Sequence, residues 1–477
     1  MKKLIYKYLI IAATGFAWLG VNATAWAWDV DPFNVEAWST PNPQTYWPKP
    51  IDLVVTDAAA PLAAYKLPHK ALTLTEVTDF ALQNNPDTRL AWFQAKAAAA
   101  QVGVDQSAYL PQLTGGFGAQ YTANWFSNPN DAQTTYGPNF SFSYLLLDFG
   151  NRSNTVLADK YAQIAANLNQ NNAIQQVILN VQQAYYDVLG QQALVTANQE
   201  NVKQAKASLE AAQALRANGL KTIGDVYQAA GSYAQAQLDL QTSQGNFQTD
   251  LGQLATTMGL PANTPLQIVS LQNPPKLDRI NQNVARLLSA AKRNRPDLLA
   301  AEAQVRQSQA ELAATRATGW PTLSVNATAQ PGGVLSNTTG TAVSASLTLS
   351  VPLFTGFSYT YSVKKAQAQM LAAQASRDQL NQQVQFQVWQ AYFALKTAEK
   401  NIYTTETLLK SSQQAYQQAF GQYKNGVGDI LSVLTTQSTL ANARVQYIQA
   451  QLNWYIALAQ LAAAIGDLTP ATQGPLS

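Results

Sequence analysis

The apolar positions of this chain recur at three- and four-residue steps through two long stretches that lack proline. The first stretch runs from 151 to about 217, and the second, from 358 to about 422, repeats its length and composition. Four positions mark one face of the first stretch: Val177, Val181, Ala184 and Val188. Because residues at this spacing share one side of a helix, we predict two continuous helices, each about 100 Å long. Ordinary globular helices are only three or four turns long, so these are rods.

Elsewhere the period changes to two, which is typical of strands. Alternating segments are predicted as strands at about 112–122 and 138–147, and again at about 322–331 and 342–353. Each pair reads as a hairpin, and each hairpin precedes one of the rods. The order helix, hairpin, long helix, turn and helix therefore occurs twice, about 207 residues apart. This tandem duplication predicts a mainly α protein with a small β part.

The chain is predicted to divide into six segments around this duplication. Lys2, Lys3 and Lys7 precede a short apolar run, and Ala25–Ala27 resembles a cleavage site, as in a secretory signal peptide. The expected segments are a signal peptide 1–27, an extended arm 28–70, a first repeat 71–262, a linker 263–283, a second repeat 284–468 and a tail 469–477.

Composition excludes several classes of function. Charged residues make up 12% of the chain, about half the usual share, and the net charge of +3 forms no basic block, so nucleic acid is not an expected partner. No Cys is present, which removes disulfides, thiolate metal sites and an N-terminal lipid anchor on Cys. The single His69 has no metal-binding companion. With no catalytic constellation visible, we expect no enzyme activity, no metal and no cofactor.

The predicted strands have one apolar face and one face of Ser, Thr, Asn and Gln, which suits a barrel wall between lipid and water. Four strands cannot close a barrel, and outer-membrane barrels begin at eight, so several chains must share one. Aromatic residues at the strand ends are expected at the two membrane interfaces. One rim would hold Tyr109, Phe149, Trp320 and Phe354, and the other Tyr121, Trp125, Phe126 and Tyr136. The alternative is the edge of a soluble β-sandwich.

Short landmarks recur in the same order in both halves. Asn84–Asp87 is matched by 294–297, Leu110-Pro111 by Trp320-Pro321, and Asp148–Gly150 by 354–356. In this order and spacing the chain, from about 72 to 468, resembles the outer-membrane efflux protein family typified by TolC.

The resemblance implies a homotrimer whose four strands per chain form a 12-stranded outer-membrane β-barrel continuous with a long periplasmic α-helical barrel. It also implies contact with outer-membrane lipid in a Gram-negative bacterium, and docking to a periplasmic adaptor (membrane fusion) protein and an inner-membrane pump. The implied function is the passive exit duct of a tripartite export or multidrug efflux system, or of type I secretion. A trimeric coiled-coil surface protein or adhesin without transport is the alternative, against which the duplication and the Gly-containing turns argue.

The turns after the two rods are the candidate gate. Gly219 and Gly426 are expected helix C-caps. By the resemblance, Tyr423 helps to hold the closed tip, while Asp225 and Asp429 stand at or beside gating acids. In a trimer each acid becomes three carboxylates around one axis, which attract cations. Both acids are also suitable N-caps of the following helices, and the two roles are compatible.

No Arg follows Gly426, where the family has a latch arginine. Arg216 or Lys221 is the expected replacement.

Overall fold

The computed structural model describes residues 40–45, 70–122, 133–269, 283–334 and 339–468. The predicted signal peptide and tail, most of the predicted arm, His69, Trp125 and Phe126 lie outside these ranges. Among the described residues, no helix is long and apolar enough to cross a membrane. The chain forms two compact units. One contains the strands with the adjoining helix ends, within 96–160 and 313–359, and the other contains most of the helical residues.

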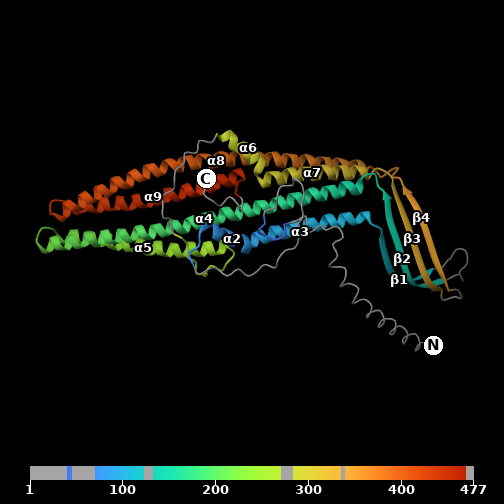
Figure 1. Ribbon diagram of the computed structural model, residues 1–477, viewed down its shortest axis with the longest axis horizontal. Coiled ribbons are helices and arrows are strands. Elements are labelled where there is room, and N and C mark those ends of the chain that lie inside the picture. Colours follow the sequence, from blue (N-terminus) through green and yellow to red (C-terminus); the bar gives the residue numbers. More distant parts are fainter. Residues whose placement is uncertain (1–39, 46–69, 123–132, 270–282, 335–338, 469–477) are drawn as a thin grey trace, which may run out of the picture. The chain divides into compact units, whose positions relative to one another are not determined.

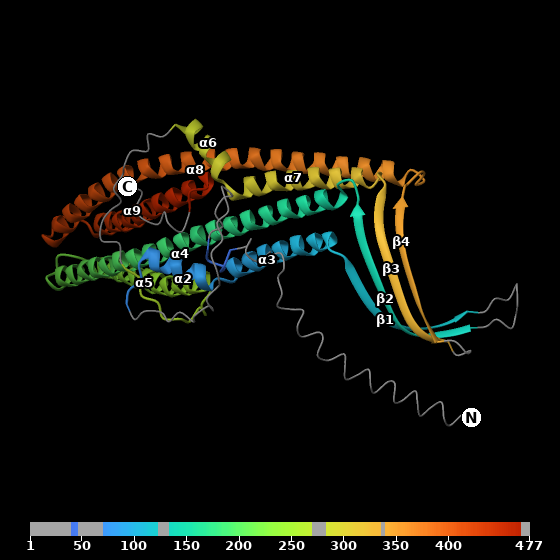
Figure 2. The same ribbon diagram turned by 45° about the vertical axis from the view of Figure 1, so that its right-hand side comes forward.

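The first unit is built on a four-stranded antiparallel sheet in the order β1-β2-β3-β4, which Figure 2 shows. The strands are β1 (Gln112–Thr122), β2 (Gln133–Leu147), β3 (Thr322–Val334) and β4 (Thr339–Ser350). Because each strand pairs with the next one along the chain, β1 and β4 are the two edges of the sheet.

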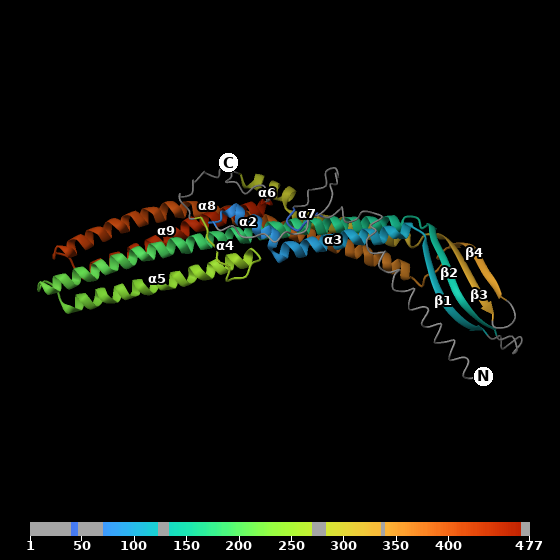
Figure 3. The same cartoon turned by 60° about the horizontal axis from the view of Figure 1, so that its bottom comes forward.

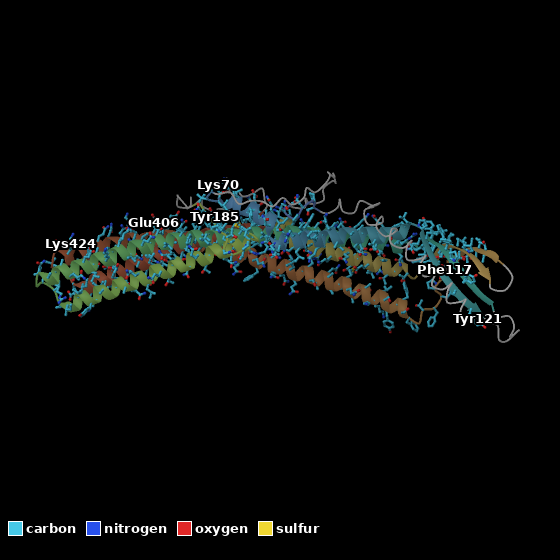
Figure 4. All side chains as sticks on the ribbon, turned by 90° about the horizontal axis from the view of Figure 1, so that it is seen from below. Lys70, Phe117, Tyr121, Tyr185, Glu406 and Lys424 are labelled. Carbon is cyan, nitrogen blue, oxygen red and sulfur yellow. The ribbon has the colours of Figure 1, made fainter. Side chains whose placement is uncertain are left out.

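The register aligns like residues across all four strands, so the predicted two-faced pattern is confirmed. One face carries apolar side chains: Leu113, Phe117, Phe140, Phe142, Val325, Val343 and Leu347. The other face carries polar ones: Thr114, Ser141, Ser143, Asn326, Thr328, Ser344 and Ser346. Hydroxyl pairs bridge the strands on the polar face, as between Thr328 and Ser344 at 2.7 Å. Figure 4 marks Phe117 on β1.

The strand bounds differ from the prediction at four ends. β3 reaches Val334 where 331 was predicted, and β4 begins at Thr339 where 342 was predicted. β2 begins at Gln133, well before the predicted 138, although Pro138 cannot donate to a ladder. The β2–β3 pairing skips the segment around Pro138, which is why the strand tolerates it. β4 ends at Ser350 and not at 353, because Pro352 lacks an N–H and restricts Val351 before it.

The strand-to-helix junction of the first unit is held by one arginine. Arg152 forms an ion pair with Asp148 at 3.1 Å, and both side chains are largely buried. Its guanidinium also donates to three main-chain carbonyls, those of Ala108, Leu145 and Leu146. Nearby, Phe149 stacks on Trp320 with ring centroids 5.8 Å apart. The two predicted rim aromatics therefore lie together.

The helices follow the predicted duplication (Figure 1). The first repeat contains α2 (Leu74–Asn84), α3 (Pro86–Gln106), α4 (Asn151–Ala217) and α5 (Ile223–Thr257). The second repeat contains α6 (Val284–Asn294), α7 (Pro296–Ala317), α8 (Ser358–Lys424) and α9 (Ile430–Ile465). α4 and α8 have 67 residues each, which confirms the two predicted rods.

The breaks between α2 and α3 and between α6 and α7 have the same packing. Asn85 ends α2 in an extended conformation before Pro86, and Arg295 ends α6 before Pro296 in the same way. A glycine backbone packs against each break: a Cβ on Gly259 would lie 2.6 Å from the carbonyl oxygen of Asn84, and one on Gly466 would lie 2.8 Å from the main chain at Arg295. Both glycines have a positive φ. The recurrent landmark is therefore a close backbone crossing that only glycine fits.

Each repeat has its own core in the second unit. The face marked by Val177, Val181, Ala184 and Val188 is buried in the first of these cores, as predicted. The corresponding face of α8 packs on α6 and α9 in the second core. Tyr186 of α4 stacks on Tyr455 of α9 with ring centroids 4.9 Å apart.

A short part of the predicted arm is described and packs on this second unit. Trp92 donates its indole N–H to the carbonyl of Thr40, and the buried Gln170 amide donates to the carbonyl of Thr45 at 3.1 Å. Residues 40–45 therefore bridge α3 and α4.

Candidate functional site: the two helix turns

The turn between α4 and α5 closes with a glycine-dependent C-cap. Gly219 has a φ of 74°, and its N–H donates to the carbonyl of Arg216 at 2.9 Å. The N–H of Leu220 donates to the carbonyl of Leu215 at 2.9 Å. These paired bonds form a Schellman motif, which satisfies the last carbonyls of the helix.

The turn between α8 and α9 repeats this motif. Gly426 has a φ of 82° and donates to the carbonyl of Tyr423 at 2.9 Å, while Val427 donates to that of Gln422 at 3.2 Å. Gly428 adds a bond of 3.1 Å to the same Gln422 carbonyl. The predicted C-caps Gly219 and Gly426 thus occupy the positions expected of them.

We expect Gly428→Ala to destabilise this turn. A Cβ at Gly428 would lie 2.7 Å from the main-chain nitrogen of Tyr423, and backbone cannot yield as a flexible side chain does. The cost is on the order of 1–3 kcal/mol. Gly421→Ala is the matched control, since nothing lies within 4 Å of its Cβ position and alanine favours a helix interior.

Limited proteolysis at the turn measures the difference between these variants. Faster cleavage in Gly428→Ala and slower or unchanged cleavage in Gly421→Ala is the expected pair of results. Equal cleavage of both variants would show that the turn has room at Gly428.

One lysine joins the two turns. Lys221, in the first turn, donates its ammonium to the carbonyl of Gly428, in the second, at 2.8 Å. The same ammonium lies 5.5 Å from the centroid of the Tyr423 ring, within cation–π range. Of the two expected replacements for the latch arginine, Lys221 makes a cross-turn contact. Arg216 is exposed and has no side-chain hydrogen bond or ion pair with the described residues.

Tyr423 is the largest fully buried side chain of the described residues, with 0% of its surface exposed. It lies in a third core that contains residues of both hairpins, including Leu215, Val226 and Ile430. Its buried hydroxyl has no well-formed hydrogen bond, although the negative charge of the Asp225 carboxylate disfavours ionisation of the phenol. Burial, together with Asp225 and Asp429, raises the pKa of Tyr423 to about 12. The phenol is therefore neutral throughout the physiological range.

The two acids differ in their local roles. The N-cap of α5 is Thr222, and Asp225 lies in the first turn of the helix, where its carboxylate accepts the Thr222 hydroxyl at 2.7 Å. The N-cap interpretation of Asp225 is therefore wrong, because the threonine precedes it at the cap. Asp429 does occupy the N-cap of α9, but its side chain makes no capping hydrogen bond and is exposed. Its carboxylate thus remains available to solvent.

Sequence reasoning missed two features of this region. Buried polar side chains of α4 and α9, among them Ser208 and Gln437, contact one another between the hairpins. Large apolar side chains are exposed at the turns themselves: Leu220, Ile223, Tyr227, Val427 and Leu431. The sequence does indicate these exposed side chains, because apolar residues stand within and beside the Gly-containing turns. The polar pairs had no local signal, because a lone Ser or Gln in a helix resembles a surface residue.

Within the described part of the chain, no group of His, Cys, Asp and Glu could hold a metal ion. The site is a pair of matched turns joined by a buried tyrosine and a lysine bridge, with two acids beside them. Such turns at the ends of helices about 100 Å long, and a sheet with one apolar and one polar face, are features expected of a membrane channel with a helical conduit.

The family is shown by a match to the model of the outer membrane efflux protein family over residues 77–260 and 287–467, and the chain belongs to this family. It is 30% identical to Protein CyaE of Bordetella pertussis, over 87% of this chain and 89% of that protein. It is 24% identical to the outer membrane protein TolC of Escherichia coli, over 85% of each. Among solved structures, the outer-membrane channel OprN matches with a TM-score of 0.75 and 20% identity, over 83% of this chain and 90% of that one.

The chain is therefore an outer-membrane efflux or secretion channel of the TolC family, and not an enzyme. It resides in the bacterial outer membrane and extends into the periplasm. Family membership also implies a trimeric channel that works with efflux systems.

Proposed function

We propose that three copies of this chain form a passive exit duct. In this duct the sheets join into one 12-stranded barrel, and the turns after α4 and α8 form the periplasmic gate. The observation that carries the proposal is the sheet, whose apolar and polar faces are continuous over four strands. In the part of the chain that the structure describes, no further strand pairs with either edge.

The open edges require partners. Among the described residues, β1 and β4 each have one row of main-chain groups with no strand beside it. Such long edges with exposed apolar side chains pair with other strands unless charges or bulges protect them. Pairing β1 of one copy with β4 of the next satisfies both edges and closes a ring. It also places the apolar face toward lipid and the Ser/Thr face toward water.

The gate is proposed at the turns because cross-hairpin contacts and acidic side chains meet there. The Lys221–Gly428 hydrogen bond ties the α4–α5 hairpin to the α8–α9 hairpin. Three copies place three Asp429 and three Asp225 carboxylates around the axis. Such a ring favours cations over anions.

The exposed apolar side chains at the turns support docking to a periplasmic adaptor. Val427 is 82% exposed, and Leu220 and Leu431 are both 62% exposed. Grouped apolar exposure of this kind marks a protein–protein contact. We propose that the adaptor covers these residues and couples the duct to an inner-membrane pump, for small-molecule efflux or for type I secretion.

The acidic gate is tested by the ion selectivity of the channel in a planar bilayer. Asp429→Asn removes three charges from a trimer but leaves a good N-cap residue in place. We expect its cation-to-anion permeability ratio, taken from the reversal potential in a salt gradient, to fall several-fold. Asp239→Asn, the same change on the exposed surface of α5, is the control and leaves the ratio unaltered. An unaltered ratio in both Asp429→Asn and Asp225→Asn would place the selective constriction elsewhere.

A further inference from the structure

α4 and α9 pair with a regular seven-residue register on the turn side of the helical unit. Figures 1 and 3 show α9 beside α4, and the two helices run in opposite directions. Leu215 of α4 and Ile430 of α9 belong to the same buried core. One step of seven residues along each helix leads to Ser208 and Gln437, which are hydrogen-bonded. A second step leads to Asn201 and Arg444, which are also hydrogen-bonded.

Small and aliphatic residues fill the intermediate layers in the same register. Ala212 and Val433 lie in the shared core, and Ala205 and Leu440, one seven-residue step further on, are both buried with 0% exposure. Seven-residue spacing of buried positions on two helices is the pattern of a coiled coil. The α4–α9 contact is thus an antiparallel heptad pair with alternating apolar and polar layers.

The first polar layer is fully enclosed. Ser208 is 0% and Gln437 is 6% exposed, and the serine hydroxyl donates to the Gln437 Oε1 at 3.1 Å. The Nε2 of Gln437 donates to the hydroxyl of Ser232 on α5 at 3.3 Å. One glutamine therefore joins α9 to both helices of the other hairpin, and both ends of its amide have a partner.

The second polar layer holds a cation without an ion pair. The Nη1 of Arg444 donates to the carboxamide oxygens of Asn201 and Gln204, the latter at 3.1 Å. Burial lowers the pKa of Arg444, against the opposing influence of Glu200. Glu200 itself is paired with Lys203. The other layers on α4, at Ala205, Ser208 and Ala212, offer the guanidinium fewer side-chain acceptors than Asn201 and Gln204 do. Moving Arg444 to another layer would therefore raise its energy.

We propose that Gln437 and Arg444 are positioning residues that lock the register of α9 on α4 and thereby hold the two turns at one level. A slip of one heptad would displace the helices by about 10 Å. It would place Gln437 against Leu215 and Arg444 against Ser208, leaving buried polar groups without partners. Polar residues at core positions are known to select register in this way, at some cost in stability. A slip would also move the Gly428 carbonyl out of reach of Lys221. The effect of the register on the gate therefore rests on the proposed function.

The register can be measured by cross-linking, since the chain contains no native Cys. Two double-cysteine proteins are compared with a short bismaleimide in detergent-extracted full-length channel. Ala212→Cys with Val433→Cys reports the observed register. Ala212→Cys with Leu440→Cys reports the register displaced by one heptad, in which Gln437 lies against Leu215. With Gln437 and Arg444 present, we expect only the first pair to cross-link.

The same two pairs are then placed in a Gln437→Leu/Arg444→Leu background. Ser208 keeps its hydrogen bond to the Gln204 carbonyl and Asn201 keeps its bond to Asn198, so we expect this variant to assemble. We expect the ratio of the first product to the second to fall about tenfold or more. The displaced register then no longer leaves the side chains of Gln437 and Arg444 buried without hydrogen-bond partners. Ile430→Ala, which leaves a cavity but keeps both layers, lowers thermal stability without changing the ratio.

An unchanged ratio in the double-leucine background would overturn the register lock, as would cross-linking of the displaced pair in the parent protein. Bilayer recordings of the same proteins address the gate separately. A displaced register with increased channel opening supports the link to the gate, and a displaced register with unchanged opening overturns that link alone. Absence of current in every variant would count against the proposed duct, while the cross-links would still decide the register.

Discussion

Replacing Lys221 with methionine is expected to increase opening of the channel in planar bilayers by about tenfold, because a hydrogen bond from a charged donor contributes roughly 1.5–3 kcal/mol. The lower end of that range applies, since Lys221 is only partly buried. Methionine keeps the aliphatic length over the Tyr423 ring but cannot donate to the Gly428 carbonyl. The variant therefore removes the contact between the hairpins without opening a cavity. Open probability at fixed voltage is the quantity to compare.

Lys203→Met is the matched control for this substitution. Lys203 is on α4, and it pairs only with the exposed Glu200 three residues away. Exposed pairs of this kind contribute little, so its channel opening should equal that of the parent protein. Tyr423→Phe should likewise have a small effect, because the buried hydroxyl makes no well-formed hydrogen bond. Equal opening in Lys221→Met and the parent protein would show that the lysine bridge does not hold the closed state.

An arginine at Leu347 should prevent assembly, whereas one at the next position should not. Leu347 lies on the apolar face of β4, and Thr348 lies on the polar face. A charge on a lipid-facing strand position costs about 2–4 kcal/mol at the membrane centre, and a trimer would carry three of them. A lumen-facing charge remains in water. Leu347→Arg should therefore lose most of its trimer, and Thr348→Arg should keep it and conduct less cation current.

The amount of trimer in outer-membrane extracts, measured on semi-native gels, distinguishes these outcomes. The two variants add the same charge one residue apart, so expression and synthesis effects should be similar. Full assembly of Leu347→Arg, or equal loss of both variants, would contradict the assignment of the two faces.

The regular parts of this fold were predictable because their signals are local. α4 begins and ends where the Pro-free periodic stretch meets Gly150 and Gly219, and the two faces of the strands follow from simple alternation. The errors have local causes as well. The clear apolar alternation begins only at Phe140, but β2 continues back through Pro138, whose missing donor falls where the β2–β3 ladder is already interrupted. Asp225 was offered as the N-cap of α5, but Thr222 precedes it and occupies that position.

The candidate site was predictable in its position but not in its contacts. Gly219 and Gly426 marked the turns, because a helix that ends in a left-handed residue favours glycine. The bridge from Lys221 to Gly428 joins equivalent positions of the two repeats, 207 residues apart, and the duplication predicts that spacing but not the contact. The contact of Ser208 with Gln437 is not predicted either, because the burial of both depends on how two hairpins pack. Only the tertiary structure places these groups together.

The central claim is that three copies share one conducting barrel, and the most direct measurement combines mass with current. The detergent-extracted protein is weighed by native mass spectrometry, and the same preparation is then inserted into a planar bilayer. We expect a mass of three chains and discrete single-channel current steps from that species. A stable complex of another copy number, or a trimer that inserts without carrying any current, would contradict the account.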